Sequence, residues 1–367
     1  MRTTDLTINK IPKSVGYWLV SGALLVVMMV ILGGYTRLSH SGLSIVTWKP
    51  VTGFIPPMST TEWLTEFELY KTSPEYKLRN YNFTVDEFKS IYWPEFYHRL
   101  LGRIMGLVFI IPFFYFLITK KLRDKKLQLN LVIIFLLGLL QGVVGWYMVK
   151  SGLIDEPSVS HYRLATHLFT ALLLFGYIFL TAIPILKPEK NILTDDGKKL
   201  KYVFGILATL IILQIIYGAF VAGLKAGLFY PTFPKMGTDW IPETVINAHQ
   251  QLGISGLTNS PYIVQFIHRW LGILLTIFAF VLYFKSRKRD LHPQQSNAIQ
   301  FIVIAVLFQF LLGIITLLNL VPVSLGVIHQ FGALIVLSSL LYTLIRFNYF
   351  RSDSQKKTTS IFARNKV

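Results

Sequence analysis

The sequence predicts an all-α polytopic membrane protein whose eight transmembrane helices form two parallel four-helix repeats. Of the 367 residues, 53% are hydrophobic and only 15% are charged, whereas about a quarter of the residues in a soluble protein are charged. Apolar runs of roughly 20 residues, the length that crosses a bilayer, recur along the whole chain. Similar motifs also occur at matching places in its two halves. These three observations predict the fold class.

The apolar runs predict the membrane crossings. In chain order they are 15–35, 97–118, 128–149, 164–185, 202–223, 264–284, 298–319 and 324–346. The connections that fall on one side of the membrane, with both chain ends, are 1–14, 120–126, 187–201, 285–290 and 346–367. They hold 23 of the 36 Lys and Arg but only 7 of the 18 Asp and Glu. An excess of Lys and Arg in short loops marks the cytoplasmic side, so we expect both termini in the cytoplasm.

The Lys and Arg residues behind the formal net charge of +18 are therefore expected to set the orientation of the chain in the membrane and to contact membrane lipid. A nucleic-acid partner is not expected. The chain has no cysteine, which excludes disulfides, thiolate metal ligands and thiol redox chemistry.

The expected domains follow from the crossings. They are a cytoplasmic N-terminal segment 1–14, a first four-helix repeat 15–186 with a long outer loop 36–96, a cytoplasmic linker 187–201, a second repeat 202–346 and a cytoplasmic tail 347–367. Because each repeat has an even number of crossings, both enter the membrane in the same sense. We expect a pseudo-two-fold axis along the membrane normal.

Three of the predicted helices carry a glutamine four residues before a glycine. The pairs are Gln141 and Gly145, Gln214 and Gly218, and Gln309 and Gly313. Small residues and amides commonly mediate helix packing in membranes. The alternative is that the amides face a cofactor.

Four histidines occupy matching positions near the outer ends of the even-numbered helices: His98, His167, His268 and His329. Histidine inside a membrane usually marks function. Two histidines per four-helix unit suit axial ligation of a haem iron held between helices. A single histidine is equally well explained as a hydrogen-bonded structural residue, but the repetition favours haem ligation. His40, His161, His249 and His292 do not follow this pattern, and we expect them at the surface.

Four arginines accompany these histidines: Arg99, Arg103, Arg163 and Arg269. Guanidinium groups near the outer interface pair well with haem propionates, or they extend toward lipid headgroups.

The repeat is broken at one position. Glu95 stands three residues before His98, whereas Gln265 stands three residues before His268. With Pro94 as the first helical residue, Glu95 is expected in the opening turn, on the same face as His98. A carboxylate there can transfer a proton or stabilise positive charge; alternatively it complements the helix N-terminus. The difference suggests one reactive half and one permanent cofactor site.

Several motifs in order resemble the haem A synthase family, in particular its mitochondrial and alphaproteobacterial branch. They are Glu95–Arg103 (EFYHRLLGR), Gly33–Leu38 (GGYTRL), Gln265–Arg269 (QFIHR) and the outer-loop motif Trp48–Gly53 (WKPVTG). The resemblance covers about residues 15 to 346. It implies oxidation of the C8 methyl group of haem O to a formyl group, giving haem A for cytochrome oxidase. Gram-positive members often carry loop cysteine pairs, which this chain lacks.

By this resemblance, His98 and His167 frame the substrate haem O, with Arg99, Arg103 and Arg163 around it. His268 and His329 ligate the iron of a resident haem b beside Arg269, and Glu95 is the catalytic carboxylate. The expected location is a prokaryotic inner membrane. Haem O synthase, cytochrome oxidase assembly proteins and a second copy of the chain are candidate partners.

Three other functions compete with this interpretation. A two-haem membrane electron-transfer cytochrome needs no carboxylate at Glu95. A haem carrier or assembly factor binds haem without chemistry. A solute transporter with parallel repeats needs a mid-membrane ion site, which the sequence does not indicate.

Overall fold

The protein is all-helical in a computed structural model that describes residues 11–48, 53–153, 158–187, 194–347 and 349. Eight helices within these residues have the length and apolar composition needed to cross a membrane, which confirms the predicted fold class. Most of the predicted tail 347–367, most of the segment 1–14 and the centre of the linker 187–201 lie outside the described residues.

The eight spanning helices follow one another with loop helices between them. They are α1 (Lys13–Leu38), α4 (Val85–Ile118), α5 (Lys125–Lys150), α6 (His161–Leu186), α7 (Asp195–Gly223), α10 (Pro261–Ser286), α11 (Pro293–Leu318) and α12 (Val323–Arg346). The loop helices are α2 (Thr60–Lys71), α3 (Pro74–Leu78), α8 (Glu243–Leu252) and α9 (Gly256–Asn259), with 3-10 turns at Ala226–Leu228 and Gly253–Ser255.

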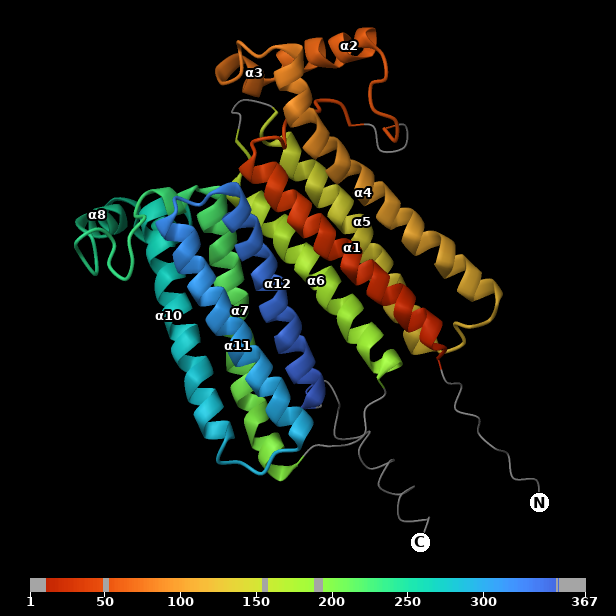
Figure 1. The fold of residues 1–367 in the computed structure, drawn as a ribbon, viewed down its shortest axis with the longest axis vertical. Helices are drawn as coiled ribbons and strands as arrows, with labels where there is room; N and C mark the ends of the chain where they lie inside the picture. The colour runs from red at the N-terminus through yellow and green to blue at the C-terminus, as the bar shows by residue number, and fades with distance from the viewer. Residues whose placement is uncertain (1–10, 49–52, 154–157, 188–193, 348, 350–367) are drawn as a thin grey trace.

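All the loop helices lie at one end of the bundle, opposite the end where α1 begins and α12 finishes (Figure 1). We call the end with the loop helices the loop end and the opposite end the basic end, because the short loops there are rich in Lys and Arg. Asp124 and Thr194 cap the starts of α5 and α7 at the basic end by accepting hydrogen bonds from backbone N–H groups.

The predicted start of the helix that carries the second crossing, at Pro94, is wrong. α4 begins at Val85, so Pro94 lies inside the helix and Glu95 is not in its opening turn. Thr84 and Glu87 form a reciprocal capping box at the true start. The first turns of α4 therefore project beyond the bundle at the loop end (Figure 1). This extension carries α2 and α3.

The two sets of four spanning helices share one pattern of neighbours. In the first set α1 contacts α4 and α6, and α5 contacts α6. In the second set α7 contacts α10 and α12, and α11 contacts α12. The sets meet where α1 packs on α12 and α6 packs on α7, which are equivalent pairs. This pattern supports the expected pseudo-two-fold repeat.

Polar contacts join the two sets near the loop end. Arg37 Nη1 on α1 donates to the carbonyl of Ala222 on α7 at 2.8 Å. Gln330 Nε2 on α12 donates to the carbonyl of Val30 on α1 at 2.8 Å, and its amide group packs against Gly34. In an apolar solvent such hydrogen bonds and close small-residue contacts hold helices together.

Aromatic side chains form a separate small core at the loop end, which we call the aromatic cap. Its buried members are Ile45, Phe67, Tyr70, Phe88, Ile91, Tyr92 and Phe96. Phe88 is fully buried, with its ring centroid 5.1 Å from that of Tyr70 and 5.3 Å from that of Phe67. The aromatic cap fixes α2 and α3 on the extension of α4.

Replacing Phe88 with Ala should loosen the aromatic cap and leave the membrane bundle folded. The lost packing and the new cavity cost about 3–5 kcal/mol in an aqueous core. Limited proteolysis should cut the 53–84 region much faster in Phe88→Ala than in the exposed control Tyr81→Ala. Equal cleavage of the two variants would contradict this description of the aromatic cap.

Candidate functional site

The four predicted histidines form two pairs. His98 on α4 and His167 on α6 are close enough for their charges to interact, and so are His268 on α10 and His329 on α12. Among the described residues, the Nδ1 atoms of His98, His167 and His268 are shielded from solvent and have no hydrogen-bond partner. Buried polar atoms without partners are rare in proteins and call for an explanation such as a bound ion.

Each of these four imidazoles lies against a glycine of a neighbouring helix. A β-carbon at the glycine would approach the ring Cε1 atom to 3.0 Å for Gly33 and His98, 3.1 Å for Gly145 and His167, 3.2 Å for Gly218 and His268, and 2.9 Å for Gly313 and His329. Such distances are tighter than ordinary van der Waals contact, so any side chain there would push the ring. The glycines therefore define where each imidazole lies.

Glutamines complete two of these contacts. Gln214 Nε2 donates to the carbonyl of His268 at 3.1 Å and lies 3.4 Å from its ring nitrogen. Gln309 Nε2 donates to the carbonyl of His329 at 2.9 Å and lies 3.2 Å from its Nδ1. Both amides bond across a helix interface, as the packing interpretation expects, whereas Gln141 Nε2 is shielded from solvent and has no hydrogen-bond partner within the described part of the chain. The amides of Gln214 and Gln309 also hold a site histidine.

The histidine pairs fit a haem better than a bare metal ion. No group of three or more His, Asp and Glu side chains that could hold a metal gathers anywhere in the described part of the chain. A porphyrin supplies four equatorial nitrogens, so a pair of histidines is all that its iron requires. The unpartnered Nδ1 atoms and the glycine contacts suit axial imidazoles.

Glu95 is buried and engaged by several donors. Its Oε2 accepts hydrogen bonds from Ser44 N at 2.7 Å, Ser44 Oγ at 2.7 Å and Ile45 N at 3.0 Å. Its Oε1 accepts from Arg99 Nη2 at 2.6 Å. Glu95 therefore joins the loop after α1 to α4.

Two arginines anchor the loops in equivalent ways. Arg99 donates to the carbonyls of Ile45 and Thr47 at 2.7 and 2.9 Å. Arg269 donates to the carbonyls of Thr232, Pro234, Lys235 and Tyr230 at 2.6–3.2 Å. Each of these guanidiniums thus has a structural role, because it holds its outer loop against a histidine helix.

Gln265 occupies the place of Glu95 in the second half. Its Nε2 donates to the carbonyl of Tyr230 at 3.1 Å, so it also ties a loop to its helix. The amide donates where the carboxylate accepts. Both side chains therefore tie a loop to a histidine helix, and at this position the two halves differ in charge.

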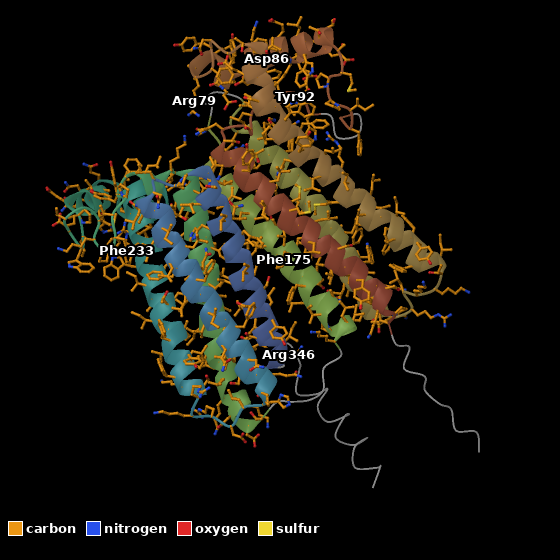
Figure 2. The ribbon with its side chains drawn as sticks, in the orientation of Figure 1. Arg79, Asp86, Tyr92, Phe175, Phe233 and Arg346 are labelled. Atoms are coloured by element: carbon orange, nitrogen blue, oxygen red, sulfur yellow. The ribbon has the colours of Figure 1, made fainter. Side chains whose placement is uncertain are left out.

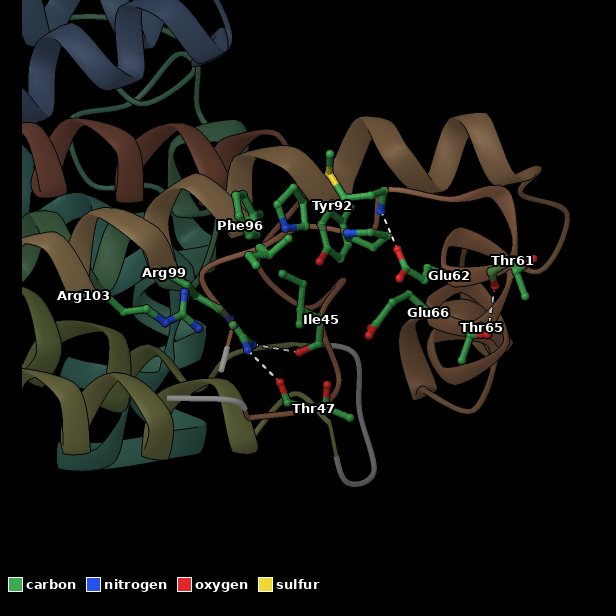
Figure 3. A pocket seen from close by; sticks show the side chains of 15 residues that line it. Ile45, Thr47, Thr61, Glu62, Thr65, Glu66, Tyr92, Phe96, Arg99 and Arg103 are labelled. Carbon is green, nitrogen blue, oxygen red and sulfur yellow. Dashed lines mark hydrogen bonds between the residues drawn. The ribbon is translucent and has the colours of Figure 1, made fainter. Parts of the chain in front are cut away.

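Arg103 borders a cavity of about 380 Å³ between the first loop and α4. Figure 3 shows Arg99 and Arg103 on one side of it and Glu62 and Glu66 on the other. Arg163 lies elsewhere: its Nη1 donates to the carbonyl of Tyr147, and its guanidinium stacks 3.8 Å from the centroid of that ring. Arg163 thus fastens α6 to α5.

The four remaining histidines are placed largely as expected. His40 and His249 are exposed, and His292 is half-buried where it caps α11. His161 differs from the expected loop position because it is the first residue of α6, half-buried against Tyr162.

Sequence reasoning missed Ser44, which gives two donors to Glu95, and Gln330, which joins the two sets of helices. The Ser41-Gly42-Leu43 motif repeats as Ala226-Gly227-Leu228 and marks the region of Ser44. It gives no sign of the carboxylate contact, which depends on how the loop folds back over α4. The motif residues 49–52 lie outside the described residues.

The fold and the site define an eight-span membrane protein with two buried histidine pairs at one end. The model of the family described as "Cytochrome oxidase assembly protein" matches residues 16–341, and the chain belongs to that family. It is 44% identical over 338 residues to a protein of Flavobacterium psychrophilum named heme A synthase, covering 92% of this chain and 98% of the relative.

Two further relatives carry the same name. One from Wolbachia pipientis is 41% identical, with 95% of each chain covered. One from Rickettsia felis is 43% identical, with 89% of this chain and 95% of the relative covered. The predicted resemblance is confirmed, and membership of this family implies that haem is involved.

Replacing Gly145 with Ala should displace the His167 ring, because the new β-carbon would lie 3.1 Å from its Cε1 atom. Disturbing the orientation of a metal ligand costs on the order of tenfold or more in affinity. Haem titration of the purified protein, followed by absorbance, should show this loss at the first-half site. Gly142→Ala on the same helix meets nothing within 4 Å and should bind like the wild type.

Proposed function

We propose that this chain is a haem A synthase that oxidises the C8 methyl group of haem O to a formyl group. The observation that carries the proposal is the repeated pair of histidines, each ring against a glycine, in a chain similar over nearly its whole length to proteins named heme A synthase. Bis-histidine ligation favours electron transfer over oxygen binding. The resident group is proposed to be haem b, which when bound supplies a redox centre for the electrons removed from the substrate.

The packing of the two halves supports His98 and His167 as the substrate pair. In the most apolar 18-residue stretch of each helix, only 6% of the residues of α4 and 17% of those of α5 are buried. These two helices also contact each other over a short stretch only. In the equivalent helices of the second half, α10 and α11, 33% of these residues are buried. α10 and α11 also pack extensively against each other. A permanent cofactor suits the tighter half, whereas a substrate that must enter and leave suits the looser half. We therefore assign His268, His329 and Arg269 to haem b.

Glu95 is proposed to act as a fixed negative charge beside the substrate. Four hydrogen bonds fix its carboxylate in place, so it is suited to stabilising positive charge that develops on the methyl carbon. Gln265 offers no such charge in the other half. Arg99 and Arg103 remain the candidates for positioning the propionates of the substrate.

We further propose an inner-membrane location with the basic end in the cytoplasm, because that end carries the excess of Lys and Arg. The site then faces the opposite compartment. Membrane lipid surrounds the apolar helices, and proposed protein partners are a haem O synthase, which would supply the substrate, and cytochrome oxidase assembly proteins, which would receive the product.

The proposal is tested by expressing the chain beside a source of haem O and analysing the extracted haems. Haem A in cells that carry the chain, and none in cells that lack it, is the expected result. Unchanged haem O together with a bound b-type spectrum would instead support an electron-transfer cytochrome or a haem carrier.

Glu95→Gln should leave haem binding intact and slow haem A formation by a factor of about 10²–10³, the usual cost of removing one preorganised electrostatic contact. The control is Asp86→Asn, which removes an exposed negative charge from the same helix. Haem A formation at the wild-type rate in Glu95→Gln would remove this carboxylate from the mechanism.

His268→Ala should remove the spectrum of the resident haem from purified protein, because leaving one axial position empty weakens the tighter site. His98→Ala should retain that spectrum and lose haem A formation. Absorbance of protein purified without added haem O distinguishes the two variants. The reverse pattern would exchange the roles of the two halves.

A further inference from the structure

A crevice of about 400 Å³ lies between the two halves at the loop end. It is lined by His40, Glu75, Arg79, Asn80 and Lys225. His40 follows α1 and Lys225 follows α7, at equivalent places in the two sets of helices, and both adopt left-handed backbone conformations with φ of 53° and 51°. Figure 2 shows Arg79 at the loop end, beside α3. The exposed side chains of His40, Arg79 and Lys225 make the crevice accessible to water.

Glu75 is the buried group of this crevice, with only 4% of its surface exposed. Its Oε2 accepts a hydrogen bond from the Tyr70 hydroxyl at 3.2 Å. Asn80 Nδ2 in turn donates to the Tyr70 oxygen at 2.8 Å. No ion pair of Glu75 is found in the part of the chain that the structure describes. A buried carboxyl group without a close cation is easily protonated.

The groups around Glu75 set its proton affinity near neutrality. Burial is the main cause that raises the pKa of Glu75 to about 7; the Glu95 charge adds to the increase, and the Tyr70 hydrogen bond and Arg79 oppose it. His40 and Lys225 line the same crevice. A carboxyl group with a pKa close to the working pH can both accept and release protons.

Oxidation of a methyl group to a formyl group releases protons as well as electrons. Glu95 is a poor carrier for them, because four hydrogen bonds hold its buried carboxylate in place. Glu75 lies within electrostatic reach of Glu95 and also borders the crevice. It is thus placed between the interior of the first half and the water at the loop end.

We propose that Glu75 is the proton-release group of this protein. A proton freed at the substrate side adds to a carboxylate oxygen of Glu75, relayed by the Tyr70 hydroxyl or by water. The O–H bond of Glu75 then breaks and the proton passes to water in the crevice, which regenerates the carboxylate. The electrons take the haem route and do not pass through Glu75. This inference rests on the proposed function.

The decisive variant is Glu75→Gln, which keeps the shape of the side chain and removes its titration. Wild-type haem A formation should fall as the pH drops through about 7, because protonated Glu75 cannot accept another proton. The rate of haem A formation by Glu75→Gln should not change with pH across this range. Above pH 7 it should be on the order of a hundredfold lower than the wild-type rate. Glu68→Gln, an exposed carboxylate on α2, is the matched control and should keep the wild-type profile.

Arg79→Gln and Tyr70→Phe provide a second test that does not remove the carboxyl group. Arg79 and the Tyr70 hydroxyl both lower the pKa of Glu75, so losing either should move the inflection to higher pH. Arg79 is exposed, so its replacement should not affect folding. Infrared titration provides a readout without turnover: a protonated-carboxyl band should titrate near pH 7 in the wild type and be missing from Glu75→Gln.

A wild-type pH profile in Glu75→Gln, or an inflection that Arg79→Gln leaves in place, would overturn the role of Glu75. If wild-type protein forms no haem A at any pH, the proposed function itself fails. The two failures are therefore distinguishable in one set of measurements.

Discussion

The contact between an imidazole and the bare backbone of a glycine is the constraint on which the rest of the structure depends. It occurs four times, at Gly33, Gly145, Gly218 and Gly313, and in each case a β-carbon would collide with the ring. Because the membrane offers no hydrophobic force between helices, such close contacts and the amides of Gln214 and Gln309 determine how they pack. The same contacts that bring the helices together thus also orient the histidines.

The outer loops depend on a second, related arrangement. Arg99 and Arg269 hold backbone carbonyls of the loops over the histidine helices, and Glu95 and Gln265 reinforce them. Because both halves link an outer loop to a histidine helix in this way, exchanging the carboxylate of Glu95 for the amide found at Gln265 changes the charge more than the shape. Glu95 accepts hydrogen bonds where Gln265 donates one, so the link between loop and helix is kept in both halves while the charge at this position differs.

The sequence predicted the eight spans and the four histidines, because apolar length and repeated polar residues in apolar helices are local signals. It failed at the start of α4, since the helix continues beyond the membrane with polar residues and Pro94 resembles a first helical residue. The Thr84 and Glu87 capping box was the available signal for the true start. The Ser44 contact and the glycine under each ring were not predictable, because they depend on which helices become neighbours.

The central proposal is that the two histidines of each half would hold one haem iron. The most direct test is electron paramagnetic resonance of the oxidised, haem-loaded protein at low temperature. The account predicts low-spin signals from bis-imidazole iron at the His268 and His329 pair, changed by substituting either residue. High-spin iron in the loaded protein, unaffected by loss of His329, would contradict it.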